Sequence, residues 1–597
     1  MKKIFNLIAL AFTALVISPS CSQLLEPEPY GLVDLDLVWT KYNYTSSLVS
    51  SIGNSADWAG GFPYAAYCDE AEAVQDRTAS GWYSWYNQDF NVSTYIMSGG
   101  WDGIYNNIRH INFFLNNEYK ISFTNVKPEE REFWDAKAHM YRAWHYFTLM
   151  KRYGKAIIFT DTYDINETFS GVKLNNVEQI ADFIIQEVDL ALATKEDESS
   201  PYTFRWRVNS YNVLNRGFAW VLKARTALFA ASPLFYEEGS KYTWEYAYEI
   251  NKEAVEQLLA HDHKLFDVAP PDKYAYNTYD YYHIYPSGDV ARSIDKETIL
   301  ANNGNMNIWQ NYGLPTTKGR LSCGICPTQE LVDCYETIDG EPILDLEKPY
   351  LDEYHLQPNY NKNNKLYDPQ NPYENRDPRF YGTIYYNNAP RWWANYDSLR
   401  VQTYVGGNCG ISEDPTSVYY TRTGYYLRKY NCSISDEDGN YDGRVHTARL
   451  AEMFLNLAEC ACEAGHLEIA TDYTNLVRER VGMPDLPHTL TQDQLRLRIR
   501  NERRVELAFE TNRWDDIRRW KIIDQVAEHV TGMRITKDAS GKLNYERFSF
   551  GTRVNKGDDK YLLYPVPDEE VQKMKQNTSP TGDPKDGDNW QNPGWDD

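Results

Sequence analysis

Apolar residues recur at three- and four-residue steps in well-separated segments of the chain, and this helical period limits the fold more than any other feature. The clearest stripes in the first half occupy residues 133–150, 177–191, 218–231 and 244–259. A side chain that returns at this interval stays on one face of a helix, so each stripe marks a face that packs against another element. Asn176 opens the second helix, because an Asn followed three residues later by Gln is a capping pair. The pattern predicts a mostly α-helical protein.

Two further stripes, at residues 450–464 and 469–481, follow one another with a short turn between them. Together they occupy about 34 residues, the size of one tetratricopeptide unit. Another pair is expected at residues 493–510 and 513–530. Helix pairs of this kind stack into a superhelical scaffold that presents a binding face.

The segment from residue 265 to 445 has a different character. It contains half of the 48 tyrosines, is dense in Asn, Pro and Gly, and shows no sustained helical period. Its aromatic content excludes low-complexity disorder, so we expect loops and short strands packed on the helices. The predicted organisation is a signal peptide at 1–20, a helical region at 21–264, an aromatic-rich irregular insert at 265–445 and a C-terminal helical part at 446–597.

The N-terminal residues predict export and a lipid anchor. Lys2 and Lys3 precede a mostly apolar stretch at 4–17, which is too short to cross a bilayer and suits a signal peptide. Cys21 follows directly, so the segment resembles a bacterial lipoprotein cleavage site, although Ser18 stands where Leu is usual. Acylation of Cys21 would anchor the chain to a membrane, since each buried methylene contributes about 0.8 kcal/mol. The alternative is ordinary secretion, with Cys21 lost or left as a free thiol.

The charge balance narrows the class of ligand. Asp and Glu outnumber Lys and Arg by 85 to 61, which gives a formal net charge of −24. An acidic body repels phosphate backbones, which argues against nucleic acid as a partner. The same repulsion mildly disfavours polyanions, and a neutral, hydroxyl-rich or apolar ligand suits the chain better.

The chain carries no motif of a catalytic centre, because it lacks the Gly-x-Ser-x-Gly elbow, the His-Glu-x-x-His helix and the Gly-rich phosphate loop. Glu502, Glu506 and Glu510 are expected to form a structural ladder of ion pairs with Arg503 and Arg513 on one helix. Composition does not exclude hydrolysis, since among 85 acidic residues some pair falls at glycosidase spacing by chance. A second structural cluster, a buried clamp that fixes a loop, is expected from Arg376, Asp377 and Arg379.

The spacing of the cysteines and acidic residues in the sequence does not predict a metal site. Cys323 and Cys326 form a lone CxxC pair with no second pair and no nearby His, which disfavours zinc. A disulfide between Cys323 and either Cys326 or Cys334 stays open, because pairing cannot be deduced from the sequence of an exported protein. Residues 436–447 begin like a calcium loop, but have Tyr at the sixth position, where Gly is needed, and Thr at the twelfth, where Glu is needed. We predict no metal and no cofactor.

Three aromatic clusters are candidates for a ligand platform. An aromatic ring packs against the C–H face of a sugar while the sugar hydroxyls reach polar neighbours. The strongest candidate is the first cluster, where Trp82 and Trp85 would form a shallow platform. The alternative is that these rings fill the core, as expected of Trp101, Trp144 and Trp520. The candidate residues are Trp82, Tyr83, Trp85, Tyr86, Trp309, Tyr312, Trp392 and Trp393.

Five groups of motifs occur in order along the chain. They are LKARTALFAASPLFY at 222–236, CPTQELVDCYETIDG at 326–340 with NRDPRF at 375–380, RLAEMFLNLAEC at 449–460 with NLVRERVG at 475–482, ERRVELAFETNRWDDIRRW at 502–520, and the tail YLLYPVPDEEV at 561–571 with QNPGW at 591–595. In this order they resemble the SusD/RagB family of surface nutrient-binding lipoproteins. The resemblance covers essentially the whole mature chain. It departs at Thr511 and Asn512, which replace smaller residues, and at Cys326 and Cys334.

The resemblance implies a fold of four tetratricopeptide-like helix pairs and a place on the cell outer membrane. It also implies a partner, a SusC-like TonB-dependent transporter. We therefore expect a surface-exposed, lipid-anchored, non-catalytic receptor that captures an oligosaccharide or polysaccharide and delivers it to that transporter. Two alternatives stay open: a peptide-capturing receptor of the same family, and a surface glycoside hydrolase on a helical scaffold.

Overall fold

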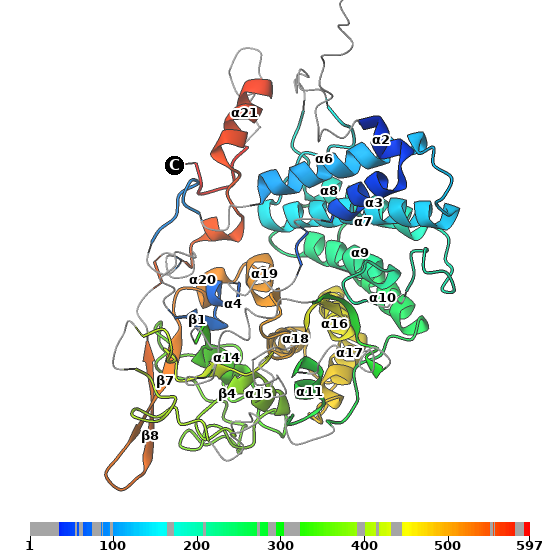
Figure 1. The fold of residues 1–597 in the computed structure, drawn as a ribbon. Coiled ribbons are helices and arrows are strands. Elements are labelled where there is room, and N and C mark those ends of the chain that lie inside the picture. The colour runs from blue at the N-terminus through cyan, green and yellow to red at the C-terminus, as the bar shows by residue number, and fades with distance from the viewer. Residues whose placement is uncertain are drawn as a thin grey trace, which may run out of the picture.

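The protein is mostly helical in a computed structural model, which describes most of the chain (Figure 1). Within the described residues, no helix is long and apolar enough to cross a membrane. The described residues are 35–53, 56–58, 64–74, 85, 88–95, 100–163, 172–206, 210–270, 275–284, 294–303, 314, 323–390, 400–412, 417–430, 444–549, 553–554, 556–578 and 590–596.

Five long helices build the first half of the scaffold: α6 (Trp101–Leu115), α7 (Pro128–Tyr153), α8 (Val177–Leu192), α9 (Arg216–Ala231) and α10 (Trp244–Ala260). Each packs against the next. The Asn176 side chain at the N-cap of α8 accepts a hydrogen bond from the backbone N–H of Gln179, and the Gln179 side chain accepts one from the backbone N–H of Asn176. The predicted capping pair is therefore confirmed. The apolar stripes that predicted α7 to α10 are buried between neighbouring helices.

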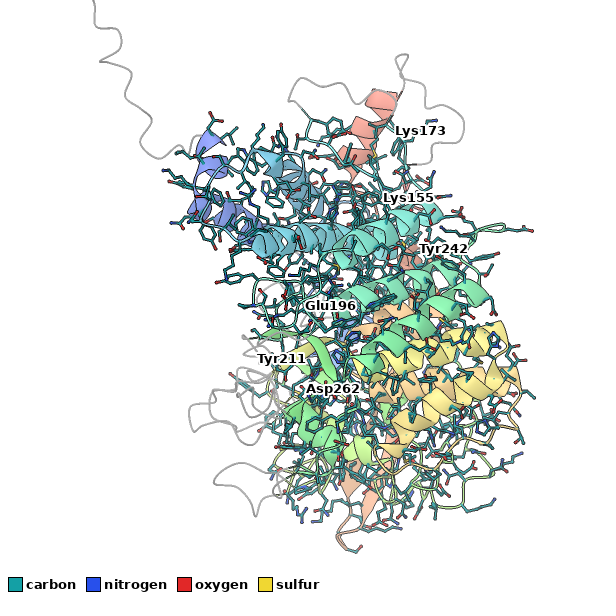
Figure 2. The ribbon with its side chains drawn as sticks, turned by 90° about the vertical axis from the view of Figure 1, so that its right-hand side faces the viewer. Lys155, Lys173, Glu196, Tyr211, Tyr242 and Asp262 are labelled. Carbon is teal, nitrogen blue, oxygen red and sulfur yellow. The ribbon has the colours of Figure 1, made fainter. Side chains whose placement is uncertain are left out.

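The helical stack continues after a long insertion. α10 packs directly against α16 (Leu450–Ala464), and α16 packs against α17 (Leu467–Glu479). Figure 2, which faces the right-hand side of Figure 1, shows the cyan, green and yellow helices lying one below another. Gly465 joins α16 to α17 with φ of +90°, a left-handed conformation that glycine adopts without strain. The tetratricopeptide-like pair predicted here is confirmed.

The last predicted pair is interrupted. A helix was expected over residues 493–510, but α18 (Gln492–Glu506) ends earlier because Phe509 and Thr511 have positive φ angles of 62° and 72°. The following segment forms two short helices in place of one, α19 (Asn512–Arg519) and α20 (Ile523–Val526).

Short strands and short helices form the segment between α10 and α16. The sequence predicted loops and strands there, but not α11 (Thr278–Ile284), α14 (Gln329–Cys334) and α15 (Pro378–Thr383), which are too short to show a helical period. The antiparallel strand pairs among the described residues are β1 (Ala71–Ala73) with β3 (Ile325–Pro327), β2 (Thr298–Asn303) with β6 (Arg444–Arg449), β4 (Ile384–Tyr385) with β5 (Tyr426–Leu427), and β7 (Thr531–Lys537) with β8 (Leu543–Ser549). The other helices are α2 (Leu35–Thr40), α3 (Tyr42–Ser51), α4 (Tyr64–Tyr67), α21 (Asp568–Thr578) and the 3-10 turns Glu118–Lys120 and Asp559–Leu562.

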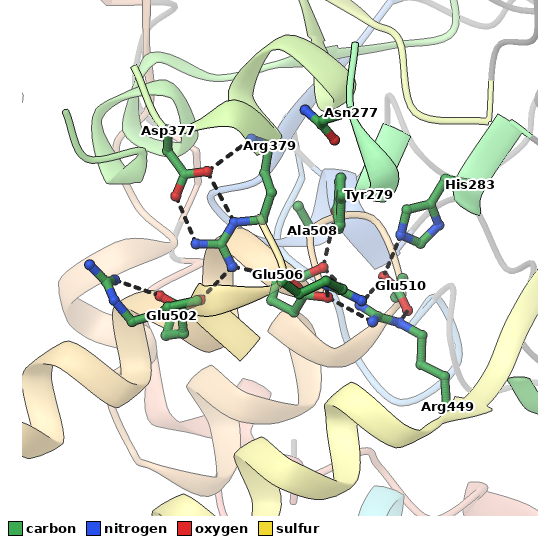
Figure 3. A network of polar contacts seen from close by, with 12 residues as sticks. Asn277, Tyr279, His283, Asp377, Arg379, Arg449, Glu502, Glu506, Ala508 and Glu510 are labelled. Carbon is green, nitrogen blue, oxygen red and sulfur yellow. Dashed lines mark hydrogen bonds and ion pairs between the residues drawn. The ribbon is translucent and has the colours of Figure 1, made fainter. Parts of the chain in front are cut away.

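A buried ionic network joins this segment to the scaffold (Figure 3). The Arg379 guanidinium contacts both Glu502 and Glu506, and its Nη1 lies 3.1 Å from Oε2 of Glu506. Arg449 from the end of β6 lies 2.7 Å from Oε1 of Glu506 and 2.7 Å from Oε2 of Glu510. Burial alone would raise the pKa of Glu506, but the guanidiniums around it outweigh burial and hold that pKa well below its usual value.

The predicted ladder within one helix is therefore wrong in its partners, although the charges are structural. Arg503 lies 3.2 Å from Asp516 on α19, and Arg513 lies 2.9 Å from Asp69 near the start of the described chain. Spacing along a helix shows which side chains share a face but not which distant elements pack on that face, and these buried charges reach distant elements.

Candidate ligand-binding site

Trp85, the described member of the first aromatic cluster, does not form a surface platform. Its side chain is 0% exposed, and its ring centroid lies 4.9 Å from that of Tyr67 and 5.3 Å from that of Tyr561. Phe90 stacks on it at 5.7 Å and Trp514 meets it edge-on at 5.7 Å. Protein covers both faces of the ring, so Trp85 belongs to the core and cannot stack on a sugar. Its partners come from distant parts of the chain, which a local sequence pattern does not show.

The other predicted aromatic and lipid-attachment residues lie outside the described residues and stay predictions. The core positions predicted for Trp101, Trp144 and Trp520 are confirmed by their burial. The residues outside the described part of the chain are Cys21, Trp82, Tyr83, Tyr86, Trp309, Tyr312, Trp392 and Trp393.

The structure brings together two of the three cysteines considered for a disulfide. The Sγ atoms of Cys323 and Cys326 are 3.3 Å apart and both residues are thiols, while the Cys334 thiol donates to the Glu330 carbonyl oxygen. Burial raises the pKa of the Cys323 thiol. Within the described residues, no group of three or more His, Cys, Asp or Glu side chains could hold a metal ion. Of residues 436–447, where the sequence disfavours a calcium loop, 436–443 are not described.

An open groove rich in tyrosine lies between the insert and the β7–β8 hairpin, and we call it the tyrosine groove. Its volume is about 760 Å³, which falls within the roughly 300–1,000 Å³ of ordinary ligand sites. Both tyrosine rings and amide side chains line it. Its lining residues are Asn371, Tyr373, Glu374, Asn375, Tyr381, Tyr386, Asn387, Asn388, Arg400, Gln402, Tyr404, Lys537, Gly541, Leu543 and Tyr545.

The first wall of the tyrosine groove is fixed by the predicted clamp. Arg376 donates to the carbonyl oxygens of Tyr335 and Pro372, and Asp377 caps α15, whose first residue is Pro378. All three clamp residues are buried, so the predicted clamp is confirmed. It holds Tyr381 of α15, whose hydroxyl donates to the Tyr373 carbonyl oxygen at 2.9 Å.

A second tyrosine of the tyrosine groove directly follows β4. Tyr385 of β4 is buried in the core, whereas Tyr386 after it is only partly buried and lines the tyrosine groove. The ring centroids of Tyr386 and Tyr373 are 5.0 Å apart. Oδ1 of Asn387 accepts from the Thr403 backbone N–H at 3.0 Å, which joins this strand to the returning chain that carries Tyr404.

The hairpin β7–β8 forms the second wall. Side chains of β8 alternate between partly buried and exposed, so Leu543 and Tyr545 share the face turned to the tyrosine groove. The Tyr545 ring meets that of Tyr373 edge-on at 5.9 Å. The backbone N–H of Val405 donates to the Ile535 carbonyl oxygen at 2.8 Å, which fastens the hairpin to the insert.

The hydroxyls of Tyr381, Tyr386 and Tyr545 are neutral at physiological pH. Burial raises the pKa of Tyr386 to about 12, and burial also raises the pKa of Tyr381 and Tyr545. Each phenol therefore both donates and accepts a hydrogen bond, as do the amides of Asn387 and Gln402. Ring faces with neutral hydrogen-bonding groups beside them match the alternating C–H and hydroxyl surfaces of a sugar.

A second hollow lies inside the scaffold between Trp144, Arg225 and α19. Its volume is about 70 Å³, and Lys151 on its wall already pairs with Asp57 at 2.8 Å and with Asp515 at 3.0 Å. An enclosed space of this size with satisfied charges suits a few waters. The tyrosine groove is therefore the better candidate for a large ligand.

Two family models match the chain. Residues 289–595, just over half of the chain, match the model described as the SusD family. Residues 45–219 match the model described as starch-binding associating with outer membrane. A curated relative, SusD-like protein P2 from Formosa agariphila, is 41% identical over 87 residues, which cover 13% of this chain and 17% of that protein.

Solved structures share the fold at low sequence identity. A SusD-like protein from Bacteroides fragilis is 22% identical, with a TM-score of 0.71 over 90% of this chain and 96% of that one. A SusD-like carbohydrate binding protein from the same species is 20% identical, with a TM-score of 0.66 over 90% and 99%. Surface glycan-binding protein A from Bacteroides fluxus is 16% identical, with a TM-score of 0.54 over 92% and 99%. With the match to the family model, the predicted resemblance is confirmed: this chain belongs to the SusD family.

Proposed function

We propose that this protein captures an oligosaccharide or polysaccharide in the tyrosine groove without cleaving it. The observation that carries the proposal is the pairing of partly exposed tyrosine rings with amide side chains along one groove of about 760 Å³. Stacking on rings supplies affinity for the sugar C–H face, and the amides and phenols supply partners for its hydroxyls. The printed descriptions of two structural relatives, a carbohydrate binding protein and a surface glycan-binding protein, support the same class of ligand.

The number of carboxylates in the described lining of the tyrosine groove favours binding over hydrolysis. Among the described residues that line it, Glu374 is the single carboxylate. A glycoside hydrolase ordinarily needs two carboxyl groups, about 5–10 Å apart, on either side of the scissile bond. We therefore expect retention of polysaccharides without release of reducing ends.

A paired assay tests this function. Affinity gel electrophoresis over a panel of neutral and acidic polysaccharides should show retarded migration in at least one gel. A reducing-sugar assay with the same polymers should show no release above the rate of buffer alone. Release of reducing ends at an enzymatic rate would favour the hydrolase alternative, and binding of peptides alone would favour the peptide receptor.

The proposal also includes the cellular location of the protein and its partner. A protein anchored by lipid on Cys21 at the outer membrane would hold its ligand beside a SusC-like TonB-dependent transporter, to which it delivers the glycan. The family description of association with the outer membrane supports this location. Cys21→Ala should move the protein from the membrane fraction to the soluble fraction after a high-salt wash. Unchanged membrane association would contradict lipid as the anchor.

A further inference from the structure

Two cations line the tyrosine groove without a carboxylate partner among the described residues. Nη1 of Arg400 lies 3.5 Å from the Asn388 carbonyl oxygen, at the long limit of a hydrogen bond, and within the described part of the chain its other side-chain donors have no hydrogen-bond partner. Nζ of Lys537 lies 5.2 Å from the centroid of the Tyr404 ring. Both side chains are exposed. The arginines of the buried network, by contrast, are each committed to carboxylates.

These cations flank the tyrosines that would hold a sugar. Lys537 lies over the Tyr404 ring, and Arg400 is close enough to Tyr386 to lower its pKa against the effect of burial. A sugar that stacks on either ring would carry its substituents toward a positive charge. The described lining of the tyrosine groove thus contains two cations that have no carboxylate partner among the described residues, and one carboxylate, Glu374.

We propose that the tyrosine groove selects glycans that carry acidic substituents, carboxylate or sulfate, and that Arg400 and Lys537 bind those groups. This inference rests on the proposed function and names its substrate class. A guanidinium presents a planar fork of donors that matches the oxygens of a carboxylate or sulfate, and an ammonium acts as a point charge beside it. A neutral glycan uses neither property.

The net charge of the whole chain does not oppose this contact. The formal charge of −24 is spread over 597 residues, and at physiological salt its field falls off within about 8 Å. Contacts at hydrogen-bond distance in the tyrosine groove are screened much less. The mild repulsion expected from composition therefore slows the approach of an acidic glycan more than it weakens the bound state.

Matched pairs of polymers test the inference in the purified protein. Polygalacturonate is compared with its carboxyl-reduced form, carrageenan with its desulfated form, and amylose and xylan serve as neutral polymers. We expect at least one acidic polymer to bind at least tenfold more tightly than its own neutral derivative. The two pairs distinguish carboxylate from sulfate as the recognised group.

Charge-removing variants show whether the two cations are responsible. Arg400→Gln and Lys537→Gln should each weaken binding of the preferred acidic polymer by about tenfold or more, since hydrogen bonds to charged groups are strong. Binding of its neutral derivative should weaken much less, because hydroxyl acceptors carry no charge. Lys542→Gln, on the same hairpin but outside the groove lining, removes the same charge and should leave both affinities unchanged.

The outcomes separate this inference from the function on which it rests. Preference for an acidic polymer that is lost in Arg400→Gln and Lys537→Gln, and kept in Lys542→Gln, supports it. Binding of neutral polymers with no preference for any acidic form overturns the inference and leaves glycan capture standing. An acidic preference that survives in both groove variants also overturns it. Absence of binding to every polymer overturns both.

Discussion

At the residue scale, Trp85 shares its surroundings with a buried lysine. Nζ of Lys556 lies 4.6 Å from the Trp85 ring centroid, 4.3 Å from that of Phe90 and 4.9 Å from that of Tyr561. It also donates to the Gln88 carbonyl oxygen at 2.7 Å. Burial lowers the pKa of Lys556 to about 7, and cation–π attraction compensates part of the lost hydration. Trp85 thus joins an N-terminal segment and a C-terminal segment of the chain in one buried aromatic cluster.

Trp85→Ala should lower the free energy of unfolding by about 3–5 kcal/mol, because it leaves a cavity where a fully buried ring packed. Affinity of the folded protein for its glycan should be unchanged. Chemical denaturation and affinity electrophoresis measure the two quantities separately. Trp85→Phe, which keeps an aromatic ring in the same place, should lose less stability. Normal stability with weakened binding would return Trp85 to the ligand site.

The residues of the tyrosine groove were not predicted as a ligand site from the sequence, although most of them belong to the aromatic-rich insert. The abundance of tyrosine between residues 265 and 445 indicated loops and short strands packed on the helices, but nothing local distinguishes Tyr385, which is buried, from Tyr386, which lines the tyrosine groove. That difference depends on the tertiary packing around the end of β4. Tyr545 comes from a hairpin more than one hundred residues away. A site whose residues are distant in the sequence leaves no motif of neighbouring residues by which it could be predicted.

At the scale of elements, the hairpin wall of the tyrosine groove depends on glycine. The Met533 backbone N–H donates to the Thr423 carbonyl oxygen at 2.8 Å, so β7 lies backbone against backbone on the insert. A Cβ on Gly532 would lie 2.5 Å from that same Thr423 oxygen, closer than real Cβ atoms approach. A side chain at this position must push the hairpin away from the insert.

Gly532→Ala should therefore lower stability by about 1–3 kcal/mol, the usual cost of overpacking, and should also weaken glycan binding by moving one wall of the tyrosine groove. Gly465→Ala is the control. It replaces a glycine with φ of +90° whose added Cβ meets nothing within 4 Å, so it should cost about 1–2 kcal/mol of backbone strain without affecting binding. Denaturation with calorimetric titration measures both effects. Equal affinities of Gly532→Ala and the unaltered protein would contradict the role of the hairpin.

The helices of the scaffold were predictable because their signals are local. Helical period and the Asn176 cap placed α7 to α10 and the pair α16–α17 close to their observed bounds. The prediction failed where a backbone conformation decides the outcome, at Phe509 and Thr511, whose positive φ angles separate α18 from α19. It also failed for ionic partners, since Glu506 finds its arginines on other elements.

At the scale of the whole molecule, buried carboxylates join distant elements and make stability depend on pH. Burial would raise the pKa of Glu459, but Arg519 and its hydrogen bonds outweigh burial and lower that pKa to about 2. Arg504 and Arg513 likewise outweigh burial and lower the pKa of Asp69 to about 2. Because these pKa values lie below those of the unfolded chain, their contribution is complete above about pH 5 and is lost as pH falls toward 2.

At neutral pH, Asp69 should contribute roughly 2–3 kcal/mol and Glu459 roughly 3–4 kcal/mol, since one pKa unit corresponds to about 1.4 kcal/mol. Denaturation midpoints should therefore fall steeply between about pH 5 and pH 2. Glu459→Gln should lower stability at pH 7, by about 3–5 kcal/mol, and flatten this acid dependence. Glu253→Gln, at an exposed position of α10, should keep the original pH profile. A variant of Glu459 with the same slope as the unaltered protein would contradict the account.

The most direct test of glycan capture in the tyrosine groove is the affinity of tyrosine variants for the polysaccharide that the protein retains best. Tyr404→Ala and Tyr545→Ala should each weaken binding by about 1–3 kcal/mol, the usual loss for a truncated aromatic contact, as measured by calorimetric titration at matched folded concentrations. Tyr419→Ala removes a tyrosine that is 56% exposed and lies outside the groove lining, and should leave the affinity unchanged. Unchanged affinity in both groove variants would contradict the account and place the ligand elsewhere on the protein.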